Sequence, residues 1–312
     1  MSKVLISDSI DNIAEKILKS NNIHVDTITD LSSDKLKEII SKYDGLIVRS
    51  ATKATKEIIE AGNNLKIIGR AGAGVDNIDL EAANKKNVIV MNTPGGNTNA
   101  TAEHTLSLLL SLAKSIPLAN TSTHKGLWEK KKFKGNEIKG KIIGIVGFGN
   151  VGKRFAEMCF GLGLKIIIYS KYFDSIKEEY KNYESVDLNN LIQESDIVSF
   201  HCKANKDNKP LINFEMLKSM KKNTLIINTA RGNLINENDL KTALEKGYIK
   251  GAAFDVFSSE PATESVLFNI PNLILTPHIA ASTVEAQIIV AEKIAKQISD
   301  YFNSGKVINS VS

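Results

Sequence analysis

The chain has 312 residues, 42% of them hydrophobic and 24% charged, a composition typical of a globular protein and not of a disordered or fibrous one. Its formal net charge of +5 is modest and the basic residues are dispersed, so neither a nucleic-acid partner nor a membrane surface is indicated. The two cysteines, Cys159 and Cys202, cannot form a disulfide framework and match no zinc-binding spacing, so no metal site is expected.

This length suits two domains, each large enough to bury its own core. The apolar run at residues 1–8 is too short for a signal peptide, and no stretch reaches the length of a transmembrane helix. We therefore expect a cytoplasmic protein with no membrane contact.

In the first third of the chain, short apolar runs alternate with segments of helical periodicity. The strand-like runs are residues 4–7, 25–28, 46–48, 66–68 and 88–91. The helical segments are residues 10–19, 33–41, 53–60 and 80–85. This alternation predicts a parallel, doubly wound α/β sheet.

Three polar or glycine-rich segments, residues 48–50, 69–74 and 92–97, follow successive strands of this predicted sheet. Ligands bind at the carboxyl ends of such strands. Arg49 and Arg70 lie there beside glycine N–H groups, which together indicate a site for a carboxylate or phosphate. Alternatively, both arginines lie on the surface and the glycines only permit turns.

Residues 94–98 have the proline and glycines of a hinge. An apolar helix is predicted over residues 99–113, with Leu106, Leu109, Leu110 and Ala113 on one face, and we expect it to cross from one domain to the next. Residues 120–137 lack clear periodicity and contain Trp128. This segment is either a solvated loop or an arm that contacts another subunit.

An apolar run beginning at Lys141 leads directly into Gly147, Gly149 and Gly152, spaced as G-x-G-x-x-G, and a helical pattern follows. In a dinucleotide site the first glycine permits the turn, the second leaves space for a pyrophosphate, and the third lets the helix pack on the strand. The helix N-terminus then binds the phosphates. The alternative is a strand-to-helix turn that merely requires glycines.

The acidic residue expected about 20 residues after this motif is missing, because Ser170 and Lys171 follow the next apolar run. A carboxylate there would bind the ribose hydroxyls and repel a 2′-phosphate, so its absence removes a barrier to NADP. Lys171 either attracts that phosphate or is an ordinary solvated lysine.

The second half of the chain repeats the strand and helix alternation. Its strand-like runs are residues 166–169, 197–201, 225–228, 251–256 and 273–275, and a helix is predicted over residues 240–246. They predict a second doubly wound sheet. The last helix, residues 282–302, begins with a capping box from Ser282 to Glu285. We expect it to return to the first domain.

Arg231, Glu260 and His278 follow three of these strands. Oxidation of a secondary alcohol needs a base for the hydroxyl proton, and histidine titrates nearest neutrality. Glu260 can orient and stabilise that imidazole, and Arg231 can bind a carboxylate. Taken singly, the histidine can be structural, Glu260 an ordinary loop acid, and Arg231 part of an ion pair across a domain. Four histidines lack comparable neighbours and are interpreted as structural: His24, His104, His124 and His201.

Residues 147–152, 228–232, 254–261 and 277–280 resemble the D-isomer-specific 2-hydroxyacid dehydrogenases, including their order of Arg, Glu and His. The resemblance implies a flavodoxin-like substrate domain, residues 1–97 and 282–312, into which a Rossmann nucleotide-binding domain, residues 98–281, is inserted. It also implies a homodimer, formed largely through the inserted domain, or a larger homo-oligomer.

The resemblance also assigns residues to roles. The implied catalytic residues are Arg231, Glu260 and His278. The implied coenzyme contacts are Gly147, Phe148, Gly149, Asn150, Val151, Gly152, Ser170, Thr229, Ala230, Asp255 and Ala280. The implied substrate contacts are Arg49, Ser50, Arg70, Gly72, Ala73 and Asn97.

Within this family, residues 48–52, 69–79 and 91–97 resemble the members that act on a small phosphorylated 2-hydroxy acid. We therefore expect oxidation of 3-phospho-D-glycerate to 3-phosphohydroxypyruvate. The alternatives are a hydroxypyruvate or glyoxylate reductase, another D-2-hydroxyacid dehydrogenase, and a dinucleotide-sensing interaction protein similar to corepressors.

NAD is the expected coenzyme, with NADP as the alternative. The doubt comes from Ser170 and from residues 201–205, which lack the proline common beside the adenine pocket. The sequence ends at Ser312, without the regulatory extension that many members carry. We therefore expect no feedback inhibition by serine through a separate domain.

Overall fold

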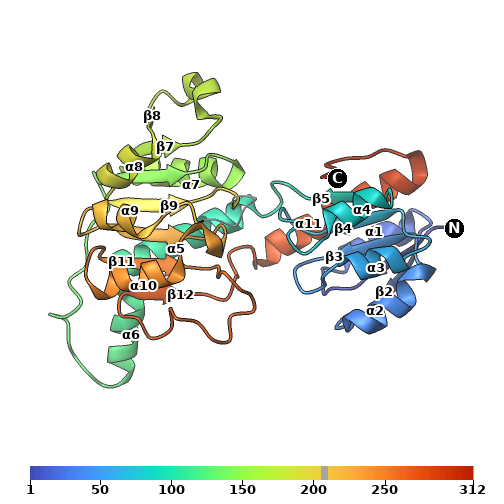
Figure 1. Ribbon diagram of the computed structural model, residues 1–312, viewed down its shortest axis with the longest axis horizontal. Helices are drawn as coiled ribbons and strands as arrows, with labels where there is room; N and C mark the ends of the chain where they lie inside the picture. The colour runs from blue at the N-terminus through green and yellow to red at the C-terminus, as the bar shows by residue number, and fades with distance from the viewer. Residues whose placement is uncertain (205–209, 312) are drawn as a thin grey trace. The chain divides into compact units, whose positions relative to one another are not determined.

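The computed structural model describes residues 1–204 and 210–311. The chain folds into two compact units (Figure 1): unit 1 comprises Met1–Asn97 and Ser282–Ser312, and unit 2 comprises Thr98–Ala281. Each contains one parallel sheet with helices on both faces. The predicted fold class, two parallel α/β sheets, is confirmed.

The sheet of unit 1 has five parallel strands in the order β2-β1-β3-β4-β5, the flavodoxin-like order. The strands are β1 (Lys3–Ile6), β2 (His24–Thr27), β3 (Gly45–Val48), β4 (Ile67–Arg70) and β5 (Ile89–Asn92). The helices are α1 (Ile13–Ser20), α2 (Ser33–Ile39), η1 (Ile40–Lys42), α3 (Lys56–Ala61), α4 (Leu80–Lys85) and α11 (Val284–Ser304).

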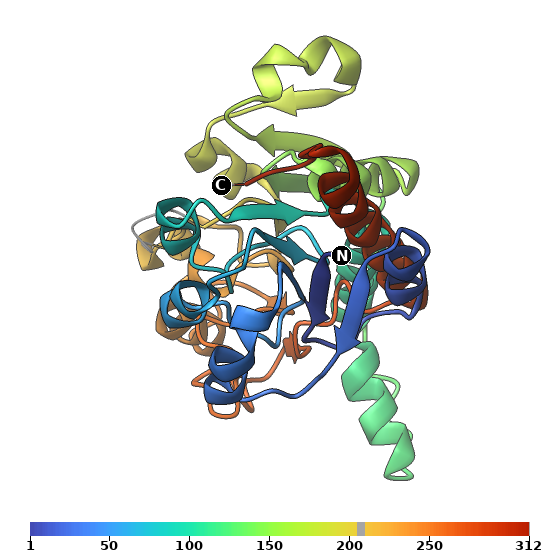
Figure 2. The same ribbon diagram turned by 90° about the vertical axis from the view of Figure 1, so that its right-hand side faces the viewer.

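Successive strand residues of unit 1 point to opposite faces, and each face has its own core. Helices α2, α3 and α4 cover one face, and α1 and α11 cover the other. Figure 2 shows α11 beside α1, with which it packs. A Cβ on Gly69 would lie 2.7 Å from side-chain atoms of both Ile294 and Ile298, so the glycine is what lets α11 approach β4 closely.

The sheet of unit 2 has seven parallel strands in the order β12-β11-β10-β9-β6-β7-β8, the Rossmann order with one added strand. The strands are β6 (Ile142–Val146), β7 (Lys165–Tyr169), β8 (Tyr183–Ser185), β9 (Ile197–Phe200), β10 (Leu225–Asn228), β11 (Gly251–Phe254) and β12 (Leu273–Leu275). The helices are α5 (Thr98–Ala113), α6 (Ile116–His124), α7 (Asn150–Gly161), η2 (Phe173–Ser175), η3 (Lys177–Tyr180), α8 (Leu188–Glu194), α9 (Phe214–Ser219), η4 (Gly232–Leu234) and α10 (Glu237–Glu245).

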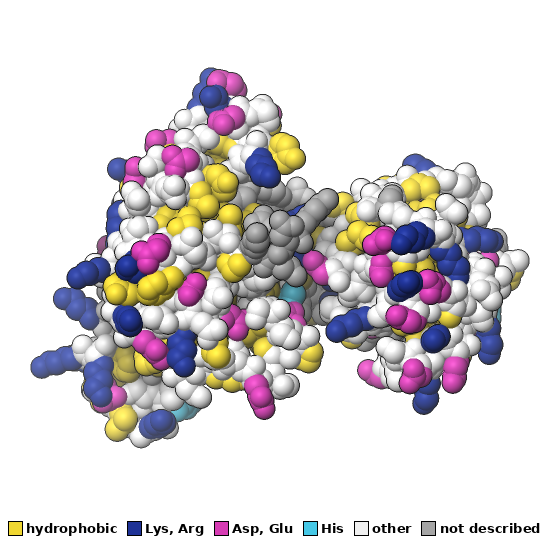
Figure 3. All heavy atoms as spheres, viewed as in Figure 1, with side chains coloured by type: hydrophobic (Ala, Val, Ile, Leu, Met, Phe, Trp, Pro, Cys, Tyr) yellow, Lys and Arg dark blue, Asp and Glu magenta, His cyan; other side chains and the backbone are white. Residues whose placement is uncertain are grey.

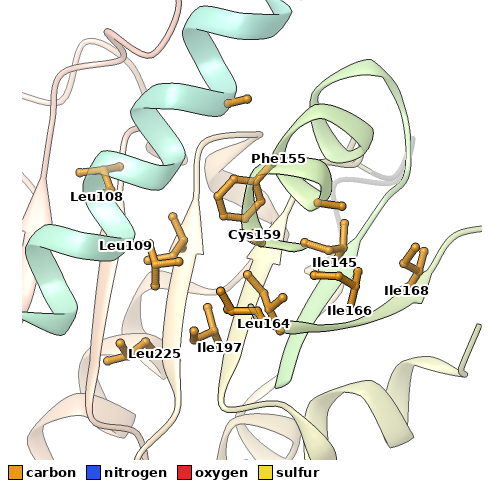
Figure 4. Packing of buried hydrophobic residues seen from close by; sticks show 14 of the residues in the cluster. Leu108, Leu109, Ile145, Phe155, Cys159, Leu164, Ile166, Ile168, Ile197 and Leu225 are labelled. Atoms are coloured by element: carbon orange, nitrogen blue, oxygen red, sulfur yellow. The ribbon is translucent and has the colours of Figure 1, made fainter. Parts of the chain in front are cut away.

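Two cores also sandwich the sheet of unit 2. On one face, α5 and α7 pack over the strands, with Phe155 and Cys159 buried among isoleucines and leucines (Figure 4). On the other face, α8, α9 and α10 pack over the opposite set of strand residues. Because both faces are covered, the strands are almost continuously apolar. This explains why they could be located in the sequence.

Two expectations about local structure are wrong. Residues 120–137 are not entirely irregular, since α6 extends into them as far as His124. The last helix is capped by Thr283 and not Ser282, because Thr283 accepts the N–H of Ala286.

Acidic and basic side chains are interspersed on the visible face of each unit (Figure 3). Among the described residues, no helix is both long and apolar enough to span a bilayer.

Candidate active site

The glycine-rich turn between β6 and α7 has the shape that a pyrophosphate site requires. Gly147 has a φ of +96°, and a Cβ there would lie 2.7 Å from Cys202 N. A Cβ on Gly152 would lie 2.2 Å from Gly147 O, whereas a Cβ on Gly149 would meet no described atom within 4 Å. The first and third glycines therefore permit close packing, and the second leaves the backbone accessible, so the turn fits a dinucleotide.

The other predicted residues of this turn present their main chain. The Phe148 ring is buried and makes edge contacts with Phe173 and Tyr180, at centroid distances of 4.9 and 5.0 Å. Its side chain therefore belongs to the core. Asn150 and Val151 form the first turn of α7, where N–H groups without a helical partner point toward an anion.

Ser170 follows β7, which pairs directly with β6, and is half-buried. Lys171, the next residue, is exposed. Asn205, the last residue of the segment that lacks the expected proline, lies outside the described residues.

The turn after β10 carries Thr229, Ala230 and Arg231, and the buried Asn228 side chain holds it. Asn228 Oδ1 accepts the N–H of Ala230 at 3.0 Å, and Asn228 Nδ2 donates to Arg231 O at 2.9 Å. The Thr229 hydroxyl lies 2.8 Å from that of Thr105 on α5. We had not predicted the role of Asn228, although an amide ending an apolar strand is a signal for it.

The loop that carries Glu260 contacts the turn that carries Arg231. A Cβ on Gly232 would lie 1.9 Å from the carbonyl carbon of Phe257. Only a glycine permits this approach of two backbones. The predicted arginine and glutamate therefore come from adjoining loops of unit 2.

His278 and Glu260 form a hydrogen-bonded pair, with 2.6 Å between Nδ1 and Oε2. Glu260 Oε1 accepts the N–H of Phe257 at 3.0 Å, which fixes the carboxylate. The hydrogen bond that His278 donates to Glu260 raises the pKa of His278, and burial opposes this rise only partly. Burial alone would raise the pKa of Glu260, but hydrogen bonds from His278 and from Phe257 outweigh it and lower that pKa. The pair thus favours an imidazolium beside a carboxylate.

The loop after β12 is held by the carboxylate of Asp255, which is fully buried. Asp255 accepts the Thr276 hydroxyl at 2.6 Å and the N–H groups of Ile279 and Ala280 at 2.9 and 2.8 Å. His278 has a φ of +52° within this loop, a left-handed conformation that is uncommon for a residue with a side chain. The residues that donate to Asp255 lie on both sides of His278 in the sequence, and their hydrogen bonds stabilise the conformation of His278.

The expectation that His104 lacks comparable neighbours is wrong, whereas its interpretation as structural stays a prediction. His104 Nε2 lies 3.2 Å from Thr276 Oγ1 and 3.4 Å from Asp255 Oδ1. The sequence around His104, which lies between Glu103 and Thr105, gave no indication of this contact. His201 does have a structural environment: it is bonded to Ser199 at 2.9 Å, and burial lowers its pKa to about 3.

In unit 1, the predicted substrate residues lie at the carboxyl ends of the neighbouring strands β3, β4 and β5. They are Arg49 and Ser50 after β3, Arg70 to Ala73 at and after β4, and Asn97 after β5. The sheet therefore brings these residues to one edge. Their roles in binding remain predictions.

The buried carboxylate of Asp8 shapes the loop after β3. It accepts the N–H of Arg49 at 2.5 Å, the N–H of Thr52 at 3.0 Å and the Thr52 hydroxyl at 2.6 Å. Asn77 Nδ2 donates to the carbonyls of both Arg49 and Thr52 at 2.6 Å. Asp8 therefore holds the N–H groups of this loop, and Asn77 holds its carbonyl groups.

Two further features lie apart from these residues. A cavity of about 290 Å³ is lined by parts of α5, α6 and β12 and by none of the predicted site residues. Among residues 1–204 and 210–311, no cluster of three or more His, Cys, Asp or Glu side chains could hold a metal ion.

Comparison with known proteins identifies the family. Residues 106–280 match the model for the NAD binding domain of the D-isomer specific 2-hydroxyacid dehydrogenases. The chain is 45% identical to a D-3-phosphoglycerate dehydrogenase of Synechocystis over 300 residues, covering 96% of this chain and 54% of that protein. It is 42% identical to a hydroxypyruvate reductase of Thermotoga maritima over 304 residues, covering 95% of this chain and 98% of that protein.

Among solved structures, an NAD⁺-bound 3-phosphoglycerate dehydrogenase of Entamoeba histolytica matches with a TM-score of 0.85 and 32% identity, over 100% of this chain and 98% of that one. The chain spans between 54 and 59% of the length of the D-3-phosphoglycerate dehydrogenases of Synechocystis, Archaeoglobus fulgidus and Methanocaldococcus jannaschii. The match to the family model covers more than half of the chain, and the glycine-rich turn fits a dinucleotide. The chain therefore belongs to the D-isomer specific 2-hydroxyacid dehydrogenases and carries their NAD-binding domain.

Proposed function

We propose that this chain catalyses the NAD-dependent oxidation of 3-phospho-D-glycerate to 3-phosphohydroxypyruvate, the first step toward serine. The observation that carries the proposal is the 2.6 Å contact between His278 Nδ1 and Glu260 Oε2. The loop that carries Glu260 adjoins the turn that carries Arg231. Such a pair supplies the acid and base that interconversion of an alcohol and a ketone requires. The names of several relatives support the substrate.

NAD held at the turn of Gly147, Gly149 and Gly152 would supply the acceptor for the hydride of the substrate's C2. Nε2 of neutral His278 takes the proton of the C2 hydroxyl as the carbonyl forms, because Nδ1 is engaged by Glu260. Glu260 stabilises the resulting imidazolium. Arg231 binds the substrate carboxylate bidentately and directs its C2 oxygen toward His278.

Arg49 and Arg70 favour a phosphorylated substrate. Arg49 follows β3 and Arg70 ends β4, both at the carboxyl edge of the unit 1 sheet, and the loop of Arg49 is fixed by Asp8. A phosphate carries up to two negative charges, and guanidinium groups bind it through paired hydrogen bonds. Unit 1 is therefore proposed as the substrate domain, and unit 2 as the coenzyme domain.

A homodimer is proposed to form through unit 2. Ile116 and Leu118 on α6 are 53% and 49% exposed, and Trp128 is 85% exposed. Apolar side chains that cluster on one projecting segment are typical of a surface covered by a partner.

Initial rates of coenzyme reduction test the proposal, with 3-phosphoglycerate compared with glycerate and 2-hydroxyglutarate, each with NAD and with NADP. We expect turnover with 3-phosphoglycerate above the other acids. The variant Arg49→Gln should weaken binding of 3-phosphoglycerate much more than binding of glycerate. Lys56→Gln is the matched control, since it removes an exposed cation of unit 1 from α3. Equal losses for both acids in Arg49→Gln would contradict a phosphate site.

A hydroxypyruvate reductase is the second candidate, because the relative from Thermotoga maritima matches over nearly its whole length. Rates measured in the reducing direction with hydroxypyruvate and 3-phosphohydroxypyruvate separate the two. Coenzyme binding without turnover of any acid would instead favour a dinucleotide-sensing protein.

A further inference from the structure

Helix α5 supports the ends of several strands that carry the predicted chemistry. Its neighbouring residues His104 and Thr105 reach different loops: His104 contacts Asp255 and Thr276, and Thr105 contacts Thr229. The Thr105 hydroxyl donates to Thr101 O at 2.7 Å, so its contact with Thr229 is an accepted bond. One turn of α5 therefore touches the loops that follow β10, β11 and β12.

The hydrogen bonds determine the tautomer of His104. Thr276 has one hydroxyl proton, which it donates to Asp255 Oδ1 at 2.6 Å. The contact of 3.2 Å between His104 Nε2 and Thr276 Oγ1 must then be donated by the imidazole. Nε2 of His104 therefore carries a proton, and that N–H also faces Asp255 Oδ1 at 3.4 Å.

This N–H completes the environment of a buried anion. Asp255 is fully buried, and burial alone would raise its pKa. The bonds from His104, from Thr276 and from the N–H groups of Ile279 and Ala280 outweigh burial and lower the pKa. Asp255 thus stays a carboxylate and accepts from both N–H groups that follow His278.

We propose that His104 is a positioning residue of the active site: it donates through Nε2 to Thr276 and Asp255, which hold His278 in its left-handed conformation opposite Glu260. The inference rests on the proposed catalytic role of His278. Without this donor, the fully buried Asp255 and the half-buried Thr276 each lose a partner. The loop can then relax toward an ordinary backbone conformation, which moves the imidazole away from Glu260.

Three full-length variants test the inference. His104→Leu removes the donor, whereas His104→Gln places an amide N–H near the former position of Nε2. Ser107→Ala is the matched control, because Ser107 is an exposed residue of α5 whose hydroxyl bonds to Glu103 O. For each variant, kcat, the KM of the acid, the Kd of NAD and the thermal unfolding midpoint would be measured.

We expect His104→Leu to lower kcat about 10- to 100-fold, as small misplacements of a reacting group do, with the Kd of NAD changed less than about threefold. His104→Gln should recover most of that loss, and Ser107→Ala should behave as the wild type. Losses of activity that follow the unfolding midpoint alone, with no recovery in His104→Gln, would show a merely structural role and overturn the inference.

A readout without coenzyme or substrate separates this inference from the proposed function. The NMR titration of the His278 imidazole in the apoprotein reports its distance from Glu260, and Asp255 and Arg231 are the other charged groups that act on it. In His104→Leu the pKa of His278 should fall toward its ordinary value. An unchanged titration would overturn the positioning role, even if the acid turned over normally. Retained turnover in His278→Gln would instead refute the proposed function, and the titration would still decide the role of His104.

Discussion

The guanidinium of Arg70 lies directly over the backbone of Gly72, so that a Cβ on this glycine would stand 1.5 Å from Arg70 Nη1. Gly72 also has a φ of +147°, a region that residues with side chains rarely adopt. The position of a predicted anion-binding arginine thus depends on the absence of a side chain two residues later.

Gly72→Ala should therefore displace Arg70 and raise the KM for 3-phosphoglycerate about tenfold or more, while the Kd of NAD is unchanged. Steady-state kinetics and coenzyme titration would measure both. Gly305→Ala is the control for backbone strain alone, since Gly305 has a φ of +72° and no described atom within 4 Å of a Cβ. An equal effect of the two variants on KM would contradict the contact with Arg70.

The His278 and Glu260 pair predicts the pH dependence of alcohol oxidation. Neutral His278 is the proposed base, so kcat/KM should fall as pH drops through its raised pKa. Glu260→Gln removes the cause of that rise, so the acid limb of the profile should move to lower pH while the maximal rate decreases. Glu264→Gln, an exposed acid on the same loop, should leave the limb in place. A profile unchanged in Glu260→Gln would show that another group controls the limb.

The residue after β7 should determine how well NADP is used. Ser170→Asp places a carboxylate where the 2′-phosphate would lie, so the ratio of kcat/KM for NADP to that for NAD should fall about tenfold or more. Parallel rates with both coenzymes give this ratio. Ser175→Asp adds the same charge on η2 and should change the ratio little. A ratio insensitive to Ser170→Asp would place the 2′-phosphate elsewhere.

The core between α7 and the unit 2 sheet offers a stability test. Phe155 is fully buried in this cluster (Figure 4), and its truncation to Ala should lower the free energy of unfolding by about 3–5 kcal/mol. Phe160, on the same helix, is 46% exposed, and Phe160→Ala should cost less than about 1 kcal/mol. Denaturant unfolding of unit 2 measures the loss of unfolding free energy in each variant. Similar losses in Phe155→Ala and Phe160→Ala would contradict the packing described.

The sequence located the strands because parallel strands covered on both faces are short, nearly continuous runs of Ile, Val and Leu. It did not locate α6, whose Ile116 and Leu118 are exposed, so that no buried stripe appears in the pattern. It also missed β8, a three-residue strand at the edge of its sheet with two exposed residues.

The site residues were predicted from their positions at the ends of strands, where ligands bind in such sheets. The contacts of His104 were not predicted, for a different reason. Helix α5 buries threonines as well as leucines and alanines, so the apolar pattern could not show which face carries His104 or which loops it meets. His104 and Asp255 are 151 residues apart in the sequence. Their contact depends on how the sheet is assembled, so it leaves no local signal.

The interruption of unit 1 by unit 2 has a consequence for synthesis on the ribosome. Helix α11 supplies much of the core on one face of the unit 1 sheet, against Gly69 of β4 and against α1. It is translated only after the whole of unit 2. While the ribosome makes unit 2, the apolar strands under α11 remain uncovered, which is a state prone to aggregation. Unit 2 can therefore close its sheet before α11 completes this core of unit 1.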